Sequence, residues 1–138
     1  MREMLTGVRT RDRVTVMQTW NGHTLSAHAD PPDLLDSVGP APMDMLLTGL
    51  AACAAGTFFV VVQKMRLPVE EVRVRVEAER SEGYPKVWAR IHYELEVVGD
   101  IPQTRAERAL VLTEKQCPAS VMLAKAAELT ASVTVVSG

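Results

Sequence analysis

The chain has 138 residues, of which 47% are hydrophobic and 23% are charged, and its formal net charge is −2. This length and composition are typical of a single globular domain, which we expect to span residues 1–138. The charge is small and no basic block is visible, which argues against nucleic acid or an anionic membrane as the main partner.

The N-terminal part is expected to contain a hairpin. Residues 1–12 are polar and could form a strand or a loose arm. The valine and threonine content of residues 13–20 predicts a strand, and residues 23–29 would be the return strand. Between them lies Asn21-Gly22, a dipeptide that tolerates the positive φ angles of a type I′ turn.

A long apolar stretch follows a loop rich in proline, aspartate and glycine. Its inner part, residues 45–62, contains eighteen residues without a charge. Pro42 suits the start of a helix, and Leu67-Pro68 would end it. The uncharged run just reaches the length of a membrane span, but small residues fill half of it and patterned globular sequence flanks it. We therefore expect a buried central helix and no membrane span.

Two segments after this helix alternate between apolar and charged residues. In residues 69–80 the apolar side carries Val72, Val74, Val76 and Ala78. In residues 87–98 it carries Val87, Ala89, Ile91, Tyr93, Leu95 and Val97. The period of two predicts two half-buried strands paired as a hairpin.

The C-terminal part is expected to hold two helices and a last strand. Residues 103–115 have the spacing of an amphipathic helix. A second helix should begin at Cys117-Pro118 and carry Val121, Met122, Leu123 and Ala126 into the core. Residues 132–136 would form the strand. The order of elements, with hairpins and no crossovers, implies an α+β domain with an antiparallel sheet.

A helix that is apolar on all sides needs burial on all sides. One small sheet covers a single side of the central helix. We therefore predict an obligate homodimer, in which a partner subunit covers the other side.

The two cysteines, Cys53 and Cys117, are 64 positions apart and are the only thiols. Cys117 lies at a predicted helix N-terminus, where exposed amides favour a thiolate. Cys53 lies in the middle of the apolar helix, where burial alone would raise its pKa and make it inert. Two buried structural cysteines are the plain alternative.

Few other residues of the sequence have the pattern of a site. Asp44 precedes Cys53 by nine residues, about 13 Å along a helix and on its opposite face. It would therefore complement the helix dipole or serve a thiol of the partner chain. The three histidines show no metal-ligand spacing, which predicts no metal site. Trp20 and Trp88 are expected in the core or at an interface.

Each cysteine lies in a distinctive local motif. The first motif is the run from Gly39 to Cys53, with its Gly-Pro-Ala-Pro start, and the second is Cys117-Pro118-Ala119-Ser120. In this order they resemble the two cysteine motifs of the OsmC/Ohr family, which comprises osmotically inducible protein C and the organic hydroperoxide resistance proteins. Tyr84-Pro85-Lys86-Val87 looks most like the YhfA-like branch of that family. The similarity covers about residues 13–136.

This resemblance implies a fold and an activity. The fold would be the OsmC-like fold, with antiparallel sheets packed on a long central helix in an intertwined homodimer. The activity would be thiol-dependent reduction of organic hydroperoxides, with Cys53 as the peroxidatic thiol and Cys117 as the resolving thiol. A sulfenic acid would form on Cys53 and condense to a disulfide, and a dithiol or lipoyl-type reductant would reopen it. No metal, flavin or haem is implied.

The site implied by the family is matched only in part. Met43 occupies the position ten residues before Cys53, where hydroperoxide-resistance members carry an acid, and Asp44 matches the glutamate of other branches. The family's arginine has no motif to align on, and Arg9, Arg11 and Arg13 are candidates. These departures leave a second hypothesis: a dimer of this fold that binds a hydrophobic small molecule or senses redox state with little peroxidase turnover.

A third hypothesis, a thiol hydrolase or transferase with Cys53 as nucleophile, lacks an evident histidine base. Residues 1–13 do not contain the apolar segment of a secretory signal. Together with two free thiols, this leads us to expect a cytoplasmic location.

Overall fold

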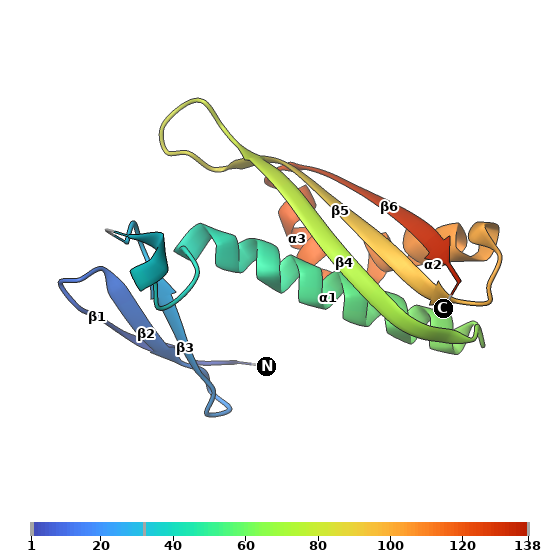
Figure 1. Ribbon diagram of the computed structural model, residues 1–138, viewed down its shortest axis with the longest axis horizontal. Coiled ribbons are helices and arrows are strands. Elements are labelled where there is room, and N and C mark those ends of the chain that lie inside the picture. The colour runs from blue at the N-terminus through green and yellow to red at the C-terminus, as the bar shows by residue number, and fades with distance from the viewer. Residues whose placement is uncertain (1, 32, 138) are drawn as a thin grey trace. The chain divides into compact units, whose positions relative to one another are not determined.

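The computed structural model describes residues 2–31 and 33–137, which form two compact units, Met1–Leu47 and Thr48–Gly138. The elements, labelled in Figure 1, are β1 (Thr6–Arg9), β2 (Val14–Gln18), β3 (Thr24–His28), the short 3-10 helix η1 (Leu34–Asp36), α1 (Pro42–Lys64), β4 (Val69–Arg80), β5 (Trp88–Gly99), α2 (Gln103–Gln116), α3 (Pro118–Ala124) and β6 (Glu128–Val136). The α+β class is therefore confirmed. A single domain over the whole chain stays a prediction.

The first unit is an antiparallel sheet of three strands in the order β1-β2-β3. Val8 pairs with Val16, and Val16 pairs with Ser26. Part of the polar segment 1–12 is thus a strand, which was one of the two expected outcomes. Most side chains of these short strands are exposed, and only Ala27 and His28 are buried at the end of β3.

The turn between β2 and β3 differs from the expected type I′ turn. Gly22 has a φ of +89°, but Asn21 does not have a positive φ. The Gly22 N–H donates to the Thr19 carbonyl at 3.0 Å, and the Thr19 N–H donates to the His23 carbonyl at 2.9 Å. This is the three-residue hairpin in which a type I turn is followed by a glycine in the left-handed region. The turn does require a glycine at position 22, as expected, but this glycine lies one residue later in the turn than it would in a type I′ turn.

His28 fastens the loop after β3 to the first sheet. Its Nε2 lies 3.1 Å from the Asp12 carbonyl, and its Nδ1 accepts the Val38 N–H at 3.3 Å. Nearby, Gly39 passes so close to the strand that a Cβ would lie 2.3 Å from the Ser26 carbonyl oxygen. His28 is therefore a structural residue with both ring nitrogens in use, and only glycine fits at position 39.

Helix α1 begins at Pro42, as expected, and ends at Lys64. One face is buried, and the residues on that face are Leu50, Ala54, Phe58, Val61 and Val62. The opposite face is exposed and holds Gly49, Ala52, Gly56 and Val60. Among the described residues, α1 is the one helix whose length and composition would allow a membrane span. Its buried face is that of a helix in a packed core.

The sheet of the second unit has the order β4-β5-β6. The expected hairpin is confirmed, since β4 and β5 pair antiparallel, with Val74 opposite Leu95. The antiparallel expectation is wrong for the last strand, because β6 runs parallel to β5 and extends over nine residues. The reason is the connection: α2 and α3 carry the chain back along the sheet, as a parallel neighbour requires.

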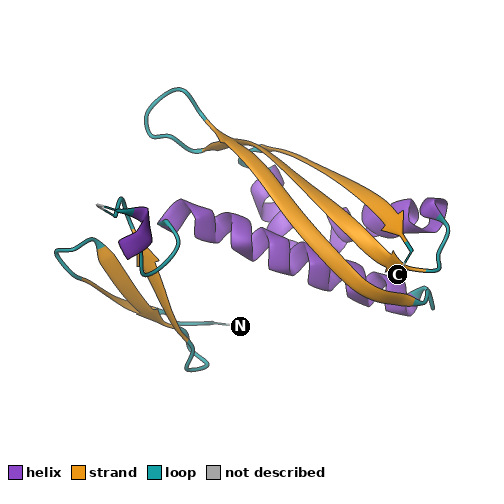
Figure 2. Cartoon of the chain, viewed as in Figure 1, coloured by secondary structure: helices purple, strands orange, loops and turns teal. Residues whose placement is uncertain are grey.

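The two faces of this sheet have the expected difference in polarity. Ile91, Tyr93, Leu95 and Val97 are buried on the inner face. The outer face carries charged residues paired with one another, including Arg73 with Glu96 at 2.7 Å. In the view of Figure 2, the helices of this unit lie behind the sheet, on the side opposite the viewer.

Helices α2 and α3 contribute unequally to the core. Helix α2 buries Ala106, Ala109, Leu110 and Thr113, as the amphipathic spacing of residues 103–115 predicts. In α3 only Ser120 is buried. The expectation that Val121, Met122 and Ala126 enter the core is wrong within the chain, since all three are exposed, and Leu123 is half-buried. The helix has only seven residues, too few for a second buried turn.

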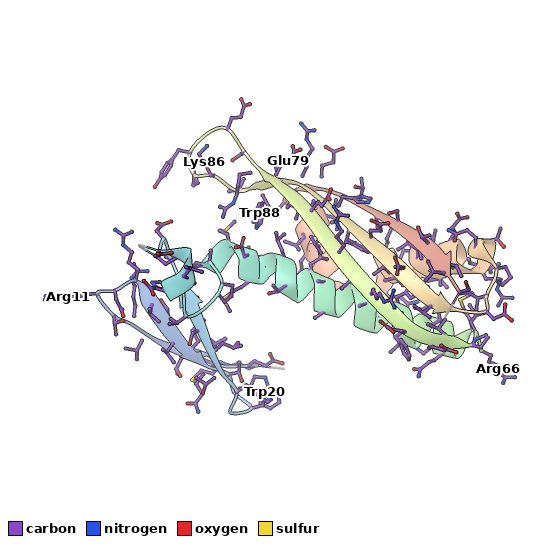
Figure 3. All side chains as sticks on the ribbon, viewed as in Figure 1. Arg11, Trp20, Arg66, Glu79, Lys86 and Trp88 are labelled. Carbon is purple, nitrogen blue, oxygen red and sulfur yellow. The ribbon has the colours of Figure 1, made fainter. Side chains whose placement is uncertain are left out.

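The two tryptophans have different surroundings. Trp20 lies in the β2–β3 turn, where 65% of its surface is exposed, so it is not a core residue of the chain. Trp88 is half-buried at the start of β5, and the Arg80 guanidinium lies 4.3 Å from its ring centroid. Both side chains are labelled in Figure 3. A role at an interface stays a prediction for each.

Candidate active site: a pair of facing thiols

The structure brings Cys53 and Cys117 together although 64 residues separate them. Both belong to the second unit and both are free thiols. Cys53 lies in the middle of α1, and Cys117 is the residue between α2 and α3. The two side chains are close enough for each to shift the pKa of the other. Two facing thiols are the arrangement required for a reversible disulfide.

The local sequence explains why a cysteine sits at this junction. The Cys117 N–H donates to the Thr113 carbonyl at 2.8 Å and so completes the last turn of α2. The residue itself is extended, with φ −73° and ψ 114°. Pro118 then occupies the first position of α3, where a missing N–H costs nothing. The sulfur is thereby held against the first turn of α3.

Cys53 has a pKa above that of an ordinary thiol. Burial is the main cause, because it disfavours the charged thiolate. The neighbouring Cys117 thiol raises the pKa further, while the Ala119 N–H and the Thr57 hydroxyl act in the opposite direction. In the isolated chain Cys53 is therefore mostly a neutral thiol at pH 7.

Cys117 has a pKa below that of an ordinary thiol. Burial opposes ionisation, but the Ser120 hydroxyl and the Ser120 N–H, which face the sulfur, outweigh it. The Cys53 thiol and the Thr57 hydroxyl act in the same direction. The expectation that Cys117 is the more easily ionised thiol is thus supported, although specific donors carry the effect and α3 is too short for a large dipole.

The more easily ionised thiol is the less accessible of the two. Cys53 is half-buried, whereas Cys117 is fully buried, with 0% of its surface exposed. A substrate can therefore approach Cys53 first. Because the two thiols lie close together, ionisation of one disfavours ionisation of the other.

Two hydroxyl groups next to this pair are buried without a partner. Neither the Tyr93 hydroxyl nor the Ser120 hydroxyl has a hydrogen-bond partner of ordinary geometry in the part of the chain that the structure describes. The two are nevertheless close to each other, since proximity to Ser120 acts on the pKa of Tyr93. Burial raises that pKa, so Tyr93 stays a neutral phenol. Unpartnered buried hydroxyls are costly and call for an explanation.

A cavity of about 280 Å³ lies beside these hydroxyls. Its lining comes from α2, α3, β5 and β6, namely Tyr93, Glu114, Ser120, Val121, Ala124, Leu129, Thr130 and Ala131. Most of the wall is apolar, and Glu114 is an exposed acid at its edge. The cavity has room for several water molecules.

The other predicted site residues belong to the first unit. Asp44 is in the first turn of α1 and is exposed. Arg9 and Arg11 are exposed in and after β1, and Arg11 is labelled in Figure 3. Arg13 donates to the Asp30 carbonyl at 3.4 Å and lies 4.0 Å from the Asp30 carboxylate. Whether Asp44 or any of these arginines completes the thiol site stays a prediction.

A metal site is not found among the residues that the structure describes, in which histidine, cysteine and acidic side chains form no group of three. His92 is engaged on the outer face of the sheet, with its Nδ1 2.7 Å from the Thr130 hydroxyl and its Nε2 3.1 Å from the Ser132 hydroxyl. His28 is engaged in the first unit. The hydrolase hypothesis therefore gains no base from these two histidines.

Three residues near the thiols were not predicted as site residues: Thr57, Tyr93 and Ser120. A signal existed for each. Thr57 lies one helical turn after Cys53, and Ser120 belongs to the second cysteine motif. Tyr93 stands at an inward position of β5, where a polar tip needs a partner.

Comparison with known proteins adds to this geometry. The family model described as OsmC-like protein matches residues 34–132. Protein YhfA of Escherichia coli K12 is 34% identical over 100 residues, which cover 71% of this chain and 75% of YhfA. The chain also resembles the crystal structure of an OsmC-like protein from Mycoplasma pneumoniae, with a TM-score of 0.87, 20% identity and coverage of 99% and 98% of the two chains.

A further structural neighbour has a name that bears on activity. The organic hydroperoxide resistance protein OhrB of Bacillus subtilis has a TM-score of 0.70 and 16% identity. The match covers 97% of this chain and 98% of OhrB. At this level of identity the similarity shows the shared fold.

Proposed function

Because the chain belongs to the OsmC-like family, a redox role is supported, and we propose that it reduces organic hydroperoxides through a disulfide between Cys53 and Cys117. The observation that carries this proposal is the contact between two thiols from distant parts of the sequence. Their surroundings also differ, since one is accessible and the other is the more easily ionised. Two thiols with divided roles are what a peroxide-reducing cycle needs.

In the proposed reaction, the Cys53 thiolate attacks the terminal oxygen of the hydroperoxide. An S–O bond forms, the O–O bond breaks, and the alkoxide leaves and takes up a proton to become an alcohol. The Cys117 thiolate then attacks the Cys53 sulfenic acid, an S–S bond forms, and hydroxide leaves as water after protonation. The two thiols lose two electrons, and the peroxide gains both.

Access decides which thiol attacks first. A bulky hydroperoxide reaches the half-buried Cys53 more easily than the fully buried Cys117. The lowered pKa of Cys117 suits the second step, because the thiolate is the form that attacks the sulfenic acid. A cation beside Cys53, for which Arg9, Arg11 and Arg13 are the candidates, would lower the pKa that burial raises.

The first experiment is a non-reducing peptide map after one equivalent of cumene hydroperoxide. We expect a peptide pair linked through Cys53 and Cys117. Cys53→Ser should abolish turnover, and Cys117→Ser should leave a sulfenic acid on Cys53 that a dimedone probe captures. Turnover retained in Cys53→Ser would eliminate the mechanism, and a sulfenic acid found on Cys117 in the wild-type chain would reverse the roles.

We also propose that the chain acts as a homodimer through the exposed face of α1. Apolar and small residues form this face, and a Cβ added at Gly49 or Gly56 would meet no described atom within 4 Å. Gly56→Gln should therefore be tolerated within one chain but disrupt the dimer. Light scattering at micromolar concentration is the test, and a stable monomer of the wild-type chain would overturn the proposal.

A dithiol or lipoyl-type molecule is the proposed reductant, because thiol–disulfide exchange regenerates both thiols without a metal or flavin. Such a cycle operates in a reducing compartment, which supports a cytoplasmic location. The test is the rate at which dihydrolipoamide reopens the isolated disulfide, compared with a monothiol at equal thiol concentration. Equal rates would argue against a dithiol reductant.

A further inference from the structure

The hydroxyl groups of Tyr93 and Ser120 are buried close to Cys117, and no structural role is evident for them. Tyr93 has 0% and Ser120 has 2% of its surface exposed. Neither hydroxyl has a partner of ordinary geometry among the described residues. A buried hydroxyl without a partner costs free energy, and replacement by an apolar group of the same shape would remove that cost. Their presence at buried positions therefore points to a state in which they do have a partner.

That state is the Cys117 thiolate. The Ser120 hydroxyl and the Ser120 N–H both face the sulfur and favour its ionised form. When Ser120 donates its hydrogen to the sulfur, its oxygen is free to accept a hydrogen from Tyr93, the next hydroxyl in line. A neutral thiol is a weak acceptor, so the donors have a strong partner only after the proton has left.

The cavity provides the route for that proton. Tyr93 and Ser120 both contribute to its wall, and Glu114 lies at its edge. A cavity of about 280 Å³ whose wall includes these hydroxyls is wide enough for water. Water there could contact the two hydroxyls and also the exposed Glu114 carboxylate, which belongs to the same wall. The deepest sulfur of the site is thereby connected with solvent without passing Cys53.

We propose that Tyr93 and Ser120 form a chain of hydrogen-bond donors that stabilises the Cys117 thiolate, and that water in the adjoining cavity exchanges the thiol proton with solvent at Glu114. Tyr93 and Ser120 are positioning residues for the resolving thiol. The inference rests on the proposed thiol chemistry of Cys117. It assigns a function to the cavity, which the disulfide cycle itself does not use.

The titratable groups around Cys117 come from three elements. Cys53 faces it from α1, Tyr93 from β5, and Glu114 acts on Tyr93 from the end of α2. The Glu114 carboxylate and the Cys117 sulfur both raise the pKa of Tyr93. Tyr93 therefore keeps its proton over the range in which Cys117 ionises and remains a donor.

The test uses the reduced protein with Cys53→Ser, in which Cys117 is the only thiol. Its ionisation is followed through the NMR shift of isotope-labelled cysteine Cβ. Ser120→Ala should lower the thiolate fraction at neutral pH about tenfold, the effect of losing one hydrogen bond to a charged group. Tyr93→Phe should act in the same direction with a smaller effect, and the double variant should match Ser120→Ala, because Tyr93 acts through Ser120.

Two matched variants serve as controls. Tyr84→Phe removes the same hydroxyl from the only other tyrosine, which is 98% exposed. Ser132→Ala removes a serine hydroxyl on the outer face of the sheet, where it contacts His92. Neither should change the titration of Cys117. The proposal would be overturned if Tyr84→Phe shifted the titration of Cys117 as much as Tyr93→Phe does, or if Ser132→Ala shifted it as much as Ser120→Ala does.

A purely structural role gives a different result. If the Tyr93 hydroxyl were only an unpartnered polar group, Tyr93→Phe would raise the melting temperature and leave the Cys117 titration unchanged, which would overturn the proposal. If Tyr93→Phe fails to fold, fluorotyrosine incorporated into the Tyr84→Phe chain makes Tyr93 a stronger donor, and the thiolate fraction should rise. The titration requires no peroxide, so loss of peroxidase activity alone would count against the proposed function and leave this inference intact.

Discussion

The two faces of the β4-β5-β6 sheet treat polar groups in opposite ways, and two adjacent residues of β5 illustrate the difference. His92 points outward, and both of its ring nitrogens lie within hydrogen-bonding distance of a hydroxyl. Tyr93 points inward, is fully buried, and its hydroxyl lacks a partner of ordinary geometry among the described residues. The charged residues of the outer face form ion pairs with one another, whereas the buried Tyr93 hydroxyl of the inner face lacks a hydrogen-bond partner of ordinary geometry among the described residues.

This difference indicates which side of the sheet in the second unit holds the reactive groups. The ion pairs of the outer face are exposed to water, and each contributes little to stability because solvent screens it. On the inner face, burial and a few oriented donors move the pKa of two thiols in opposite directions. The number of charged residues is therefore a poor guide to the site, and the scarcity of buried polar groups is a better one.

The largest effect is expected from the inner face. Leu95 has 0% of its surface exposed at the centre of β5. Leu95→Ala should lower the free energy of unfolding by about 2–5 kcal/mol, because it removes buried contacts and leaves a cavity. Urea denaturation measures the change. A loss below about 1 kcal/mol would mean that the inner face is not the packed core described above.

An intermediate effect is expected from pH. Cys117 in the Cys53→Ser chain should titrate below an ordinary thiol, because the Ser120 donors favour its thiolate. Cys53 in the Cys117→Ser chain should titrate above one, because burial disfavours its thiolate. As pH rises from acid, Cys117 therefore ionises first. NMR titration of labelled cysteine decides the order, and the reverse order would contradict the electrostatics assigned to the pair.

The smallest effect is expected from the outer face. Arg73 contacts Glu71 at 2.8 Å and Glu96 at 2.7 Å, but the three side chains are 57%, 55% and 42% exposed. Arg73→Ala should change the free energy of unfolding by less than about 1 kcal/mol and leave thiol titration unchanged. The same urea series provides the comparison with Leu95→Ala. An equal loss from the two variants would remove the distinction between the faces.

Much of the fold followed from the sequence by local rules. The alternation of residues 69–80 and 87–98 predicted β4, β5 and the direction in which their side chains point, because a strand has a period of two. The prediction was wrong for Val87, which precedes β5 and is exposed. Proline at positions 42 and 118 fixed the starts of α1 and α3 to within one residue. The α+β class and the two cysteine motifs were likewise readable from the printed sequence.

Other features depended on tertiary contacts. The parallel direction of β6 depends on how α2 and α3 return the chain, which local propensity does not encode. The type of the β2–β3 turn depended on strand register, which the Asn-Gly dipeptide alone does not fix. The sequence predicted more buried residues in α3 than the structure contains, because the local sequence does not fix where this helix ends.

For the site, the sequence by itself determined which atoms are available: two thiols, and a serine three residues after the second. Only the tertiary structure decided that Cys53 of α1 lies close to Cys117 at the junction of α2 and α3, with Tyr93 of β5 nearby. Spacing along one helix or strand specifies neighbours within that element. Contacts between elements, and the burial that shifts a pKa, arise only when the helices close over the inner face of the sheet.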